Sequence, residues 1–169
     1  MSTTAKLYSY DYRTAKTYMF ATAFIAGNLL LPQLTHLVPN GGPMLLPIYF
    51  FTLIAAYKYG VHVGLLTAVL SPVINSLLFG MPMAAMLPII ITKSVLLAIA
   101  AGWMAKKTGV VSVLNILLVV LAYQVIGTAF EWVILSDFGA ALQDFRIGFP
   151  GMLIQIFGGY LVLQSISKV

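Results

Sequence analysis

Polar side chains inside otherwise apolar segments are the residues of this chain that could do chemistry. Gln124 and Glu131 lie about two helical turns apart within residues 110–135, so a helix there would carry both on one face. Lys93 and Gln155 lie inside two other apolar segments. Amides and charges are costly in hydrocarbon unless a partner, water or a ligand satisfies them. Their convergence in the outer half of several helices predicts an outward-opening polar cavity that is closed at its inner end.

Two roles are open for Lys93, which lies too deep in its segment for its stem to reach the inner boundary easily. Its ammonium could contact a ligand, or it could pair with Glu131. Lys93 and Arg146 would favour a carboxylate or phosphate ligand, whereas Glu131 and Asp144 would suit a cationic ring. The sequence leaves the charge of the ligand open.

The sequence has none of the common catalytic motifs. It contains no HExxH, GxSxG or P-loop pattern, no pair of histidines at helical spacing and no cysteine. An intramembrane hydrolase with Glu131 and His36 as acid–base groups would also need a nucleophile or a metal site, and neither is found. We therefore expect no catalytic residue, no metal, no cofactor and no enzymatic activity.

The composition predicts a membrane protein that folds as one helical domain. The 169 residues are 61% hydrophobic and 8% charged, and the mean hydropathy is +1.01, values typical of a chain surrounded by lipid. We predict an all-α bundle of six transmembrane helices, the second of them short. The predicted segments are residues 17–38, 44–57, 61–79, 82–104, 110–135 and 147–166.

The cationic residues are distributed by side of this predicted bundle. The connections 39–43, 80–81 and 136–146 contain only Arg146, and Lys93 lies within a segment. The positive-inside rule therefore places both termini in the cytoplasm. The expected location, a prokaryotic plasma (inner) membrane, is a judgement from the class of protein and does not follow from this rule. The pI near 9.5 is explained by cations that suit anionic lipid headgroups, so we expect a lipid bilayer and no nucleic acid as partner. The cations on the predicted inner side are Lys6, Arg13, Lys16, Lys58, Lys106, Lys107 and Lys168.

The predicted domain comprises residues 17–169, preceded by a cytoplasmic or interfacial segment. Residues 1–16 mix charges with tyrosines and are too polar to cross, so they should form an interfacial helix or a disordered tail. Within the domain, prolines are expected to interrupt the first four helices. These prolines are Pro32, Pro47, Pro72 and Pro88.

Three passages resemble the substrate-binding S components of energy-coupling factor transporters, which are vitamin-uptake systems of the ATP-binding-cassette class. One is similar to the second and third helices of that family with their glycine-paired turn and short outer loop, and another to the entry of the sixth helix. A third is similar to the small-residue motif, usually Ala-x-x-x-Ala, by which S components dock on the transmembrane coupling subunit. The passages are Pro43–Pro47 with Tyr59–Gly64, Ser71–Pro72 and Phe79–Pro82; Gly148–Gln155; and Thr22–Ala26 with Ala23–Gly27.

The resemblance implies a substrate site at the outer end, among the fourth to sixth helices and beneath the outer loops, the first of which contains Asn40. The implied partners are a small vitamin-like molecule, a transmembrane coupling subunit and two ATPase subunits. Thr22, Ala23, Ala26 and Gly27 would form the docking surface. The resemblance and the positions of the polar side chains together give the candidate substrate-binding residues. These are Asn40, Asn75, Lys93, Gln124, Glu131, Arg146 and Gln155.

The favoured function is therefore capture of a small water-soluble vitamin or related micronutrient for delivery through an ATP-driven complex. The alternative is a membrane scaffold in an envelope assembly, comparable with the small helical bundles of the rod-shape proteins. A scaffold needs interaction surfaces but no outward polar cavity, so replacement of Lys93 and Gln155 should leave it functional.

Overall fold

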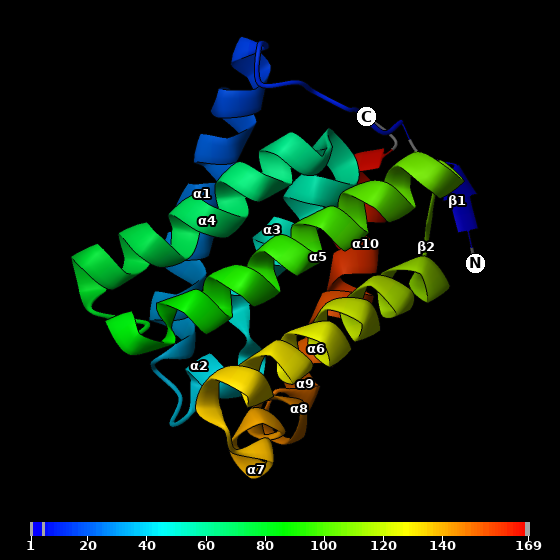
Figure 1. The fold of residues 1–169 in the computed structure, drawn as a ribbon. Helices are drawn as coiled ribbons and strands as arrows, with labels where there is room; N and C mark the ends of the chain where they lie inside the picture. Colours follow the sequence, from blue (N-terminus) through cyan, green and yellow to red (C-terminus); the bar gives the residue numbers. More distant parts are fainter. Residues whose placement is uncertain (1, 5, 168–169) are drawn as a thin grey trace.

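Long, mainly apolar stretches determine the main helices of the chain, and three of these helices end at a glycine. A computed structural model describes residues 2–4 and 6–167, and Figure 1 shows its fold. The elements are β1 (Ser2–Thr4), α1 (Ala15–Thr35), α2 (Gly41–Leu45), α3 (Pro47–Tyr59), α4 (Val61–Phe79), the 3-10 turn η1 (Ala84–Met86), α5 (Leu87–Thr108), β2 (Val110–Ser112), α6 (Val113–Leu135), α7 (Phe138–Ala141), α8 (Gln143–Ile147), α9 (Phe149–Leu153), the π-helical turn η2 (Ile154–Gly158) and α10 (Gly159–Ser167). The predicted all-α class is confirmed.

Glycines with positive φ end α3, α4 and α5. Gly60 (φ 102°) separates α3 from α4, Gly80 (φ 67°) ends α4, and Gly109 (φ 65°) ends α5. Such angles are unfavourable for residues with a Cβ, which is why the helices end there. At the start of α6 the Ser112 hydroxyl accepts a hydrogen bond from the Asn115 backbone N–H at 3.1 Å, as an N-cap does.

The predicted second segment, residues 44–57, is not one helix. Leu46 adopts a left-handed conformation (φ 48°) and divides it into α2 and α3. Pro47 is the first residue of α3, so the predicted interruption of the second segment does occur at this proline. Pro88 lies in the first turn of α5, where a missing N–H costs nothing, so the prediction that it interrupts its helix was wrong. Pro32 and Pro72 do lie inside α1 and α4.

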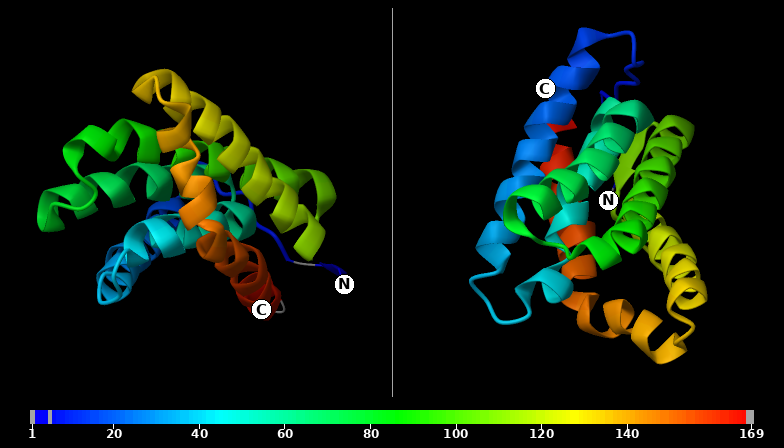
Figure 2. Two further views of the ribbon diagram at one scale, coloured as in Figure 1. Left: turned by 90° about the horizontal axis from the view of Figure 1, so that it is seen from below. Right: turned by 60° about the vertical axis from the view of Figure 1, so that its left-hand side comes forward.

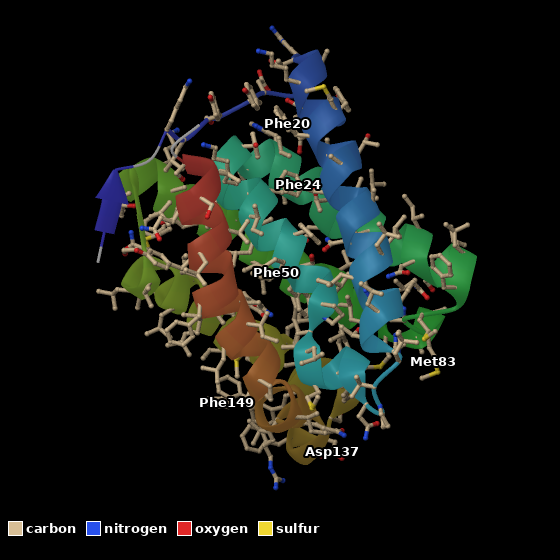
Figure 3. All side chains as sticks on the ribbon, turned by 180° about the vertical axis from the view of Figure 1, so that it is seen from behind. Phe20, Phe24, Phe50, Met83, Asp137 and Phe149 are labelled. Carbon is tan, nitrogen blue, oxygen red and sulfur yellow. The ribbon has the colours of Figure 1, made fainter. Side chains whose placement is uncertain are left out.

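The two ends of the bundle differ in structure. Figure 1 shows both chain ends, β1 and β2 at one end, whereas α2, α7 and α8 lie at the other. The right-hand view of Figure 2 shows the same division. In Figure 3, Met83 and Asp137 lie toward one end and Phe20 toward the opposite end. The long helices therefore alternate in direction between a strand-bearing end and a loop-bearing end.

Residues 6–11 form a strap without helix or strand across the strand-bearing end, and a turn follows at residues 12–13; this differs from the predicted interfacial helix or disordered tail. The backbone N–H of Tyr8 donates to the Lys58 carbonyl at 2.8 Å, and that of Tyr10 donates to the Tyr59 carbonyl at 3.2 Å. The buried Lys58 ammonium donates to the carbonyls of Lys6 (2.7 Å) and Ile166 (2.8 Å). Beside the strap, β1 pairs antiparallel with β2. These bonds join segments that are distant in sequence and close this end.

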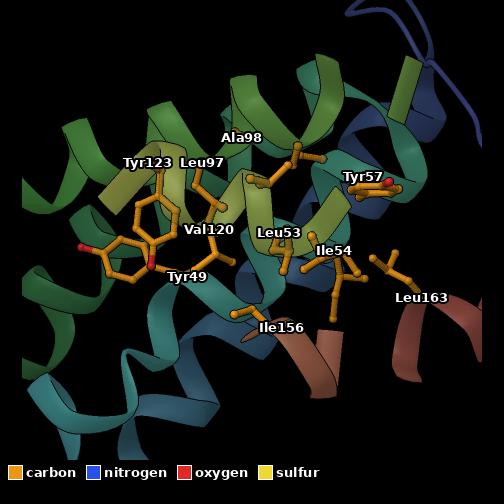
Figure 4. Packing of buried hydrophobic residues seen from close by; sticks show 14 of the residues in the cluster. Tyr49, Leu53, Ile54, Tyr57, Leu97, Ala98, Val120, Tyr123, Ile156 and Leu163 are labelled. Atoms are coloured by element: carbon orange, nitrogen blue, oxygen red, sulfur yellow. The ribbon is translucent and has the colours of Figure 1, made fainter. Parts of the chain in front are cut away.

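Helix α3 lies among α1, α4 and α5 and supplies much of the core. Leu53 and Ile54 of α3 are almost fully buried, together with Leu97 of α5 and Val120 of α6 (Figure 4). Many large apolar side chains on the outside of the bundle are exposed, among them Leu77 and Val133. An apolar core inside an apolar exterior is expected of a protein that lies in lipid.

Within the described residues, four helical stretches are long and apolar enough to cross a membrane. Helix α3, with 13 residues, is shorter than the roughly 20 residues of a typical span. Helix α1 has 21 residues, but its polar side chains lower its hydropathy below that of the four. The four stretches are Val61–Phe79, Ala84–Thr108, Val113–Leu135 and Phe149–Ser167.

Candidate functional site

A buried ion pair lies in the seam between α5 and α6. The Lys93 ammonium is 2.5 Å from a carboxylate oxygen of Glu131, and the two side chains are 0% and 3% exposed. Gly127 makes room for the pair, because a Cβ there would lie only 2.5 Å from Lys93 Cγ. The lysine stem thus lies across a gap in the surface of α6. Of the two roles open for Lys93, the structure shows the contact with Glu131.

Unpaired polar groups lie on the same stripe of α6 as Glu131. Gln124 is fully buried, and neither atom of its side-chain amide has a hydrogen-bond partner within the described part of the chain. The Thr128 hydroxyl, one turn later, is also buried and unpaired there. Buried amides and hydroxyls in proteins are nearly always hydrogen-bonded. This stripe therefore offers donors and acceptors that a bound molecule or water could satisfy.

Gln155 extends the polar site to the helix that packs opposite. Its side-chain oxygen accepts a hydrogen bond from the Tyr123 hydroxyl at 2.9 Å, whereas its nitrogen has no partner within residues 2–4 and 6–167. Gln155 lies in the π-helical turn η2, and such wide turns occur frequently at functional sites. The Tyr123 ring packs against Tyr49 of α3, with centroids 5.4 Å apart (Figure 4).

Asn75 belongs to a separate polar network between α1, α3 and α4. Its side-chain oxygen accepts from Gln33 at 3.3 Å, and its nitrogen donates to the Asn28 carbonyl at 3.4 Å. The Asn28 amide nitrogen donates to the hydroxyls of Thr52 (3.1 Å) and Ser71 (3.2 Å). These bonds join the three helices in the bundle interior, although the Asn28 side-chain oxygen has no partner within the described residues.

A cavity of about 440 Å³ opens at the loop-bearing end, between the ends of α1 and α4, the α2–α3 connection and the start of α5. Its lining is mainly apolar, and Asn75 and His36 are among its few polar groups. Met83, which is 69% exposed, is part of the rim. Tyr49 lines the inner wall and has its ring against Tyr123, so this residue separates the cavity from the polar site around Gln155.

The structure brings together only part of the predicted substrate-binding set. Lys93 and Glu131 pair across the α5–α6 seam, and Gln124 lies on the same stripe of α6 as Glu131. Gln155 is bonded to Tyr123, which precedes Gln124 on α6. Asn75 lies on the wall of the open cavity. Asn40 and Arg146 are exposed at the loop-bearing end and join neither group; Arg146 lines a second, polar hollow with Asp137 and Gln143. The Asp144 side chain and Lys168 lie outside the described part of the chain.

The predicted docking residues divide between the outside and the inside of α1. Thr22, Ala23 and Ala26 are exposed, so a foreign helix can approach them closely. Gly27 is half-buried, and a Cβ there would lie 2.9 Å from the ring of Phe51 on α3. This glycine serves the contact between α1 and α3.

Of the residues that line the open cavity, sequence reasoning proposed Asn75 for substrate binding but not the methionines. Met81, Met83 and Met86 all line it. Three methionines and a proline within six positions on a short connection were the available signal. Tyr49 carried no signal, because a tyrosine in an apolar helix is usually only part of the core. In the described residues no three His, Cys, Asp or Glu side chains are grouped so that they could hold a metal ion.

Comparison with protein-family models, with curated proteins and with solved structures gives no match for this chain. The geometry of its own side chains therefore carries the functional argument.

Proposed function

We propose that the chain is a substrate-capture subunit that takes a small water-soluble vitamin or related micronutrient from outside the cell and delivers it through an ATP-driven energy-coupling factor complex. The observation that carries this proposal is the contrast between the ends of the bundle. One end has a cavity large enough for a small molecule, with buried polar groups beyond its inner wall. The other is covered by the strap and by Lys58.

In this proposal six helical segments cross the membrane: α1, α2–α3, α4, α5, α6 and α9–α10. The strand-bearing end faces the cytoplasm, because it holds nearly all of the described cations outside the bundle interior. The cavity then faces the outside of a prokaryotic plasma membrane. The short α3 can be accommodated because α2 and the flanking turns extend it toward the surface.

The sequence has no nucleotide-binding motif, so the energy for uptake would come from a partner or from an ion gradient, and we propose a partner. We propose that a transmembrane coupling subunit docks on the exposed small residues Thr22, Ala23 and Ala26 of α1, and that two ATPase subunits bind to that partner. Small side chains let two helices approach closely enough for extensive van der Waals contact in lipid.

The test is whether the cavity holds the transported molecule. Protein purified in detergent would be analysed by native mass spectrometry for a co-purified ligand, and that compound would then be used in uptake assays. Met86→Trp should fill the cavity and abolish both ligand and uptake. Met19→Trp, on the exposed side of α1, is the control for a bulky residue and should keep both. An envelope scaffold would instead keep its cellular role in the Met86→Trp variant.

A further inference from the structure

We infer that the polar site around Gln124 binds an uncharged group that presents a hydrogen-bond donor beside an acceptor, as a cyclic amide, imide or urea does. This inference rests on the proposed function, since it names the class of substrate that the capture subunit would take.

The charge in the seam is already balanced. Lys93 and Glu131 are both buried and only 2.5 Å apart, so the pair has no net charge to offer to a ligand. A carboxylate or ammonium ligand would have to be desolvated without an opposite charge in excess, which is strongly unfavourable in an apolar interior. The pair thus disfavours both the anionic and the cationic ligands that the isolated residues suggest.

The unpaired atoms are those of neutral groups. Gln124 has both an unpaired N–H donor and an unpaired carbonyl acceptor, and the Gln155 nitrogen and Thr128 hydroxyl are unpaired as well among the described residues. A primary amide holds its donor and acceptor in one plane, so the matching ligand edge is another planar amide. A buried donor or acceptor without a partner carries the full cost of its desolvation, so a ligand edge that pairs with it is favoured.

The remainder of the ligand should be apolar. The open cavity is lined mainly by apolar side chains, and its wall includes Ile89, one helical turn before Lys93 on α5. Tyr49 lies between the cavity and Tyr123, whose hydroxyl is already bonded to Gln155. The cavity is mainly apolar and the unpaired polar groups lie beyond it. A compact molecule with an apolar body and an uncharged amide edge therefore matches both.

The test uses three probes of similar size: 4-propylimidazolidin-2-one, pentanoate and pentylammonium. Binding to the purified full chain would be measured by ligand-observed NMR and by the shift in thermal unfolding. The cyclic urea should bind, and the two ions should bind at least tenfold more weakly. Stronger binding of either ion would overturn the inference.

Variants locate the interaction. Gln124→Met keeps the length of the side chain but removes the amide, and it should weaken binding of the cyclic urea at least tenfold without lowering the unfolding temperature. Gln124→Asn keeps the amide but moves it by one methylene, and it should also weaken binding. Gln164→Leu, on α10 away from the seam, should leave binding unchanged.

Two outcomes would overturn the inference at Gln124. Unchanged urea binding in Gln124→Met would show that the probe binds elsewhere. A fall in unfolding temperature with no change in binding would show a structural amide that water satisfies. Uptake assays separate these failures from failure of the proposed function: binding of the urea without uptake by the coupled complex would refute the function alone, whereas uptake of a charged compound would refute only the inference.

Discussion

The ammonium of Lys93 and the carboxylate of Glu131 lie 2.5 Å apart across the α5–α6 seam, where neither side chain reaches solvent. In sequence the two residues are separated by a loop, a strand and parts of two helices. Their contact makes the seam electrically neutral and fixes the relative rotation of α5 and α6.

Removal of one partner should destabilise the protein more than removal of both. Lys93→Met leaves a buried carboxylate without its counter-charge, a change that typically costs about 3–5 kcal/mol. The double variant Lys93→Met/Glu131→Gln should recover much of the lost unfolding temperature, measured by circular dichroism in detergent. If the double variant is no more stable than the single one, the pair is not the main source of the effect.

Gly127→Ala should loosen the same seam by a steric route. The added methyl group would lie 2.5 Å from Lys93 Cγ, so the lysine stem or the helix must move. Overpacking of this kind typically costs about 1–3 kcal/mol. Gly139→Ala, on the exposed loop-bearing end, is the matched control and should change the unfolding temperature little. Equal effects of the two substitutions would contradict the packing described here.

Lys58→Met should release the strap. Two carbonyls, those of Lys6 and Ile166, would lose their donor, at a cost of about 1–3 kcal/mol for each group that stays buried. Chymotrypsin should then cleave after Tyr8 or Tyr10 at lower protease concentrations than in the unmodified protein. Lys106→Met removes an exposed cation and serves as the control. Resistance equal to that of the unmodified protein would mean that other contacts hold the strap.

The orientation can be tested by single cysteines, because the chain has none of its own. With an impermeant maleimide on intact cells, Gln143→Cys should be labelled and Lys107→Cys should be labelled only after lysis. Both positions are exposed in the structure, so access of the reagent depends on the side of the membrane alone. The reverse pattern would place the cavity in the cytoplasm.

The proposed docking surface predicts different results for neighbouring residues of α1. Ala26→Trp should prevent assembly with the proposed coupling subunit in a pull-down, while ligand affinity of the isolated chain changes by less than about threefold, under 1 kcal/mol. Gly27→Ala should instead lower the unfolding temperature, because its new methyl group meets Phe51. Loss of ligand affinity in Ala26→Trp equal to the loss of assembly would argue against a separate docking face.

The sequence predicted those features that depend on neighbouring residues, such as the bounds of a helix. The segment 61–79 coincides with α4, since Gly60 and Gly80 flank a mainly apolar stretch of helical length. The pairing of Lys93 with Glu131 was one of two roles that the sequence left open, because helix rotation is set by packing such as that of Gly127 against the lysine stem. The strap could not be predicted, since its bonds from Lys58 reach residues 52 and 108 positions away. The division at Leu46 was also hidden, because residues other than glycine rarely adopt a left-handed conformation.

The π-helical turn Ile154–Gly158 lies between α9 and α10. Because it is wider than an α-helical turn, it changes the direction in which the side chains of α10 point relative to those of α9. Deleting one residue from this turn would rotate everything on one side of it by about 100° relative to the other. The hydrogen bond between Tyr123 and Gln155 would then be lost, although no neighbouring residue would have been substituted. Helix length, as well as residue type, is therefore a variable by which this fold could change the chemistry that it presents to a ligand.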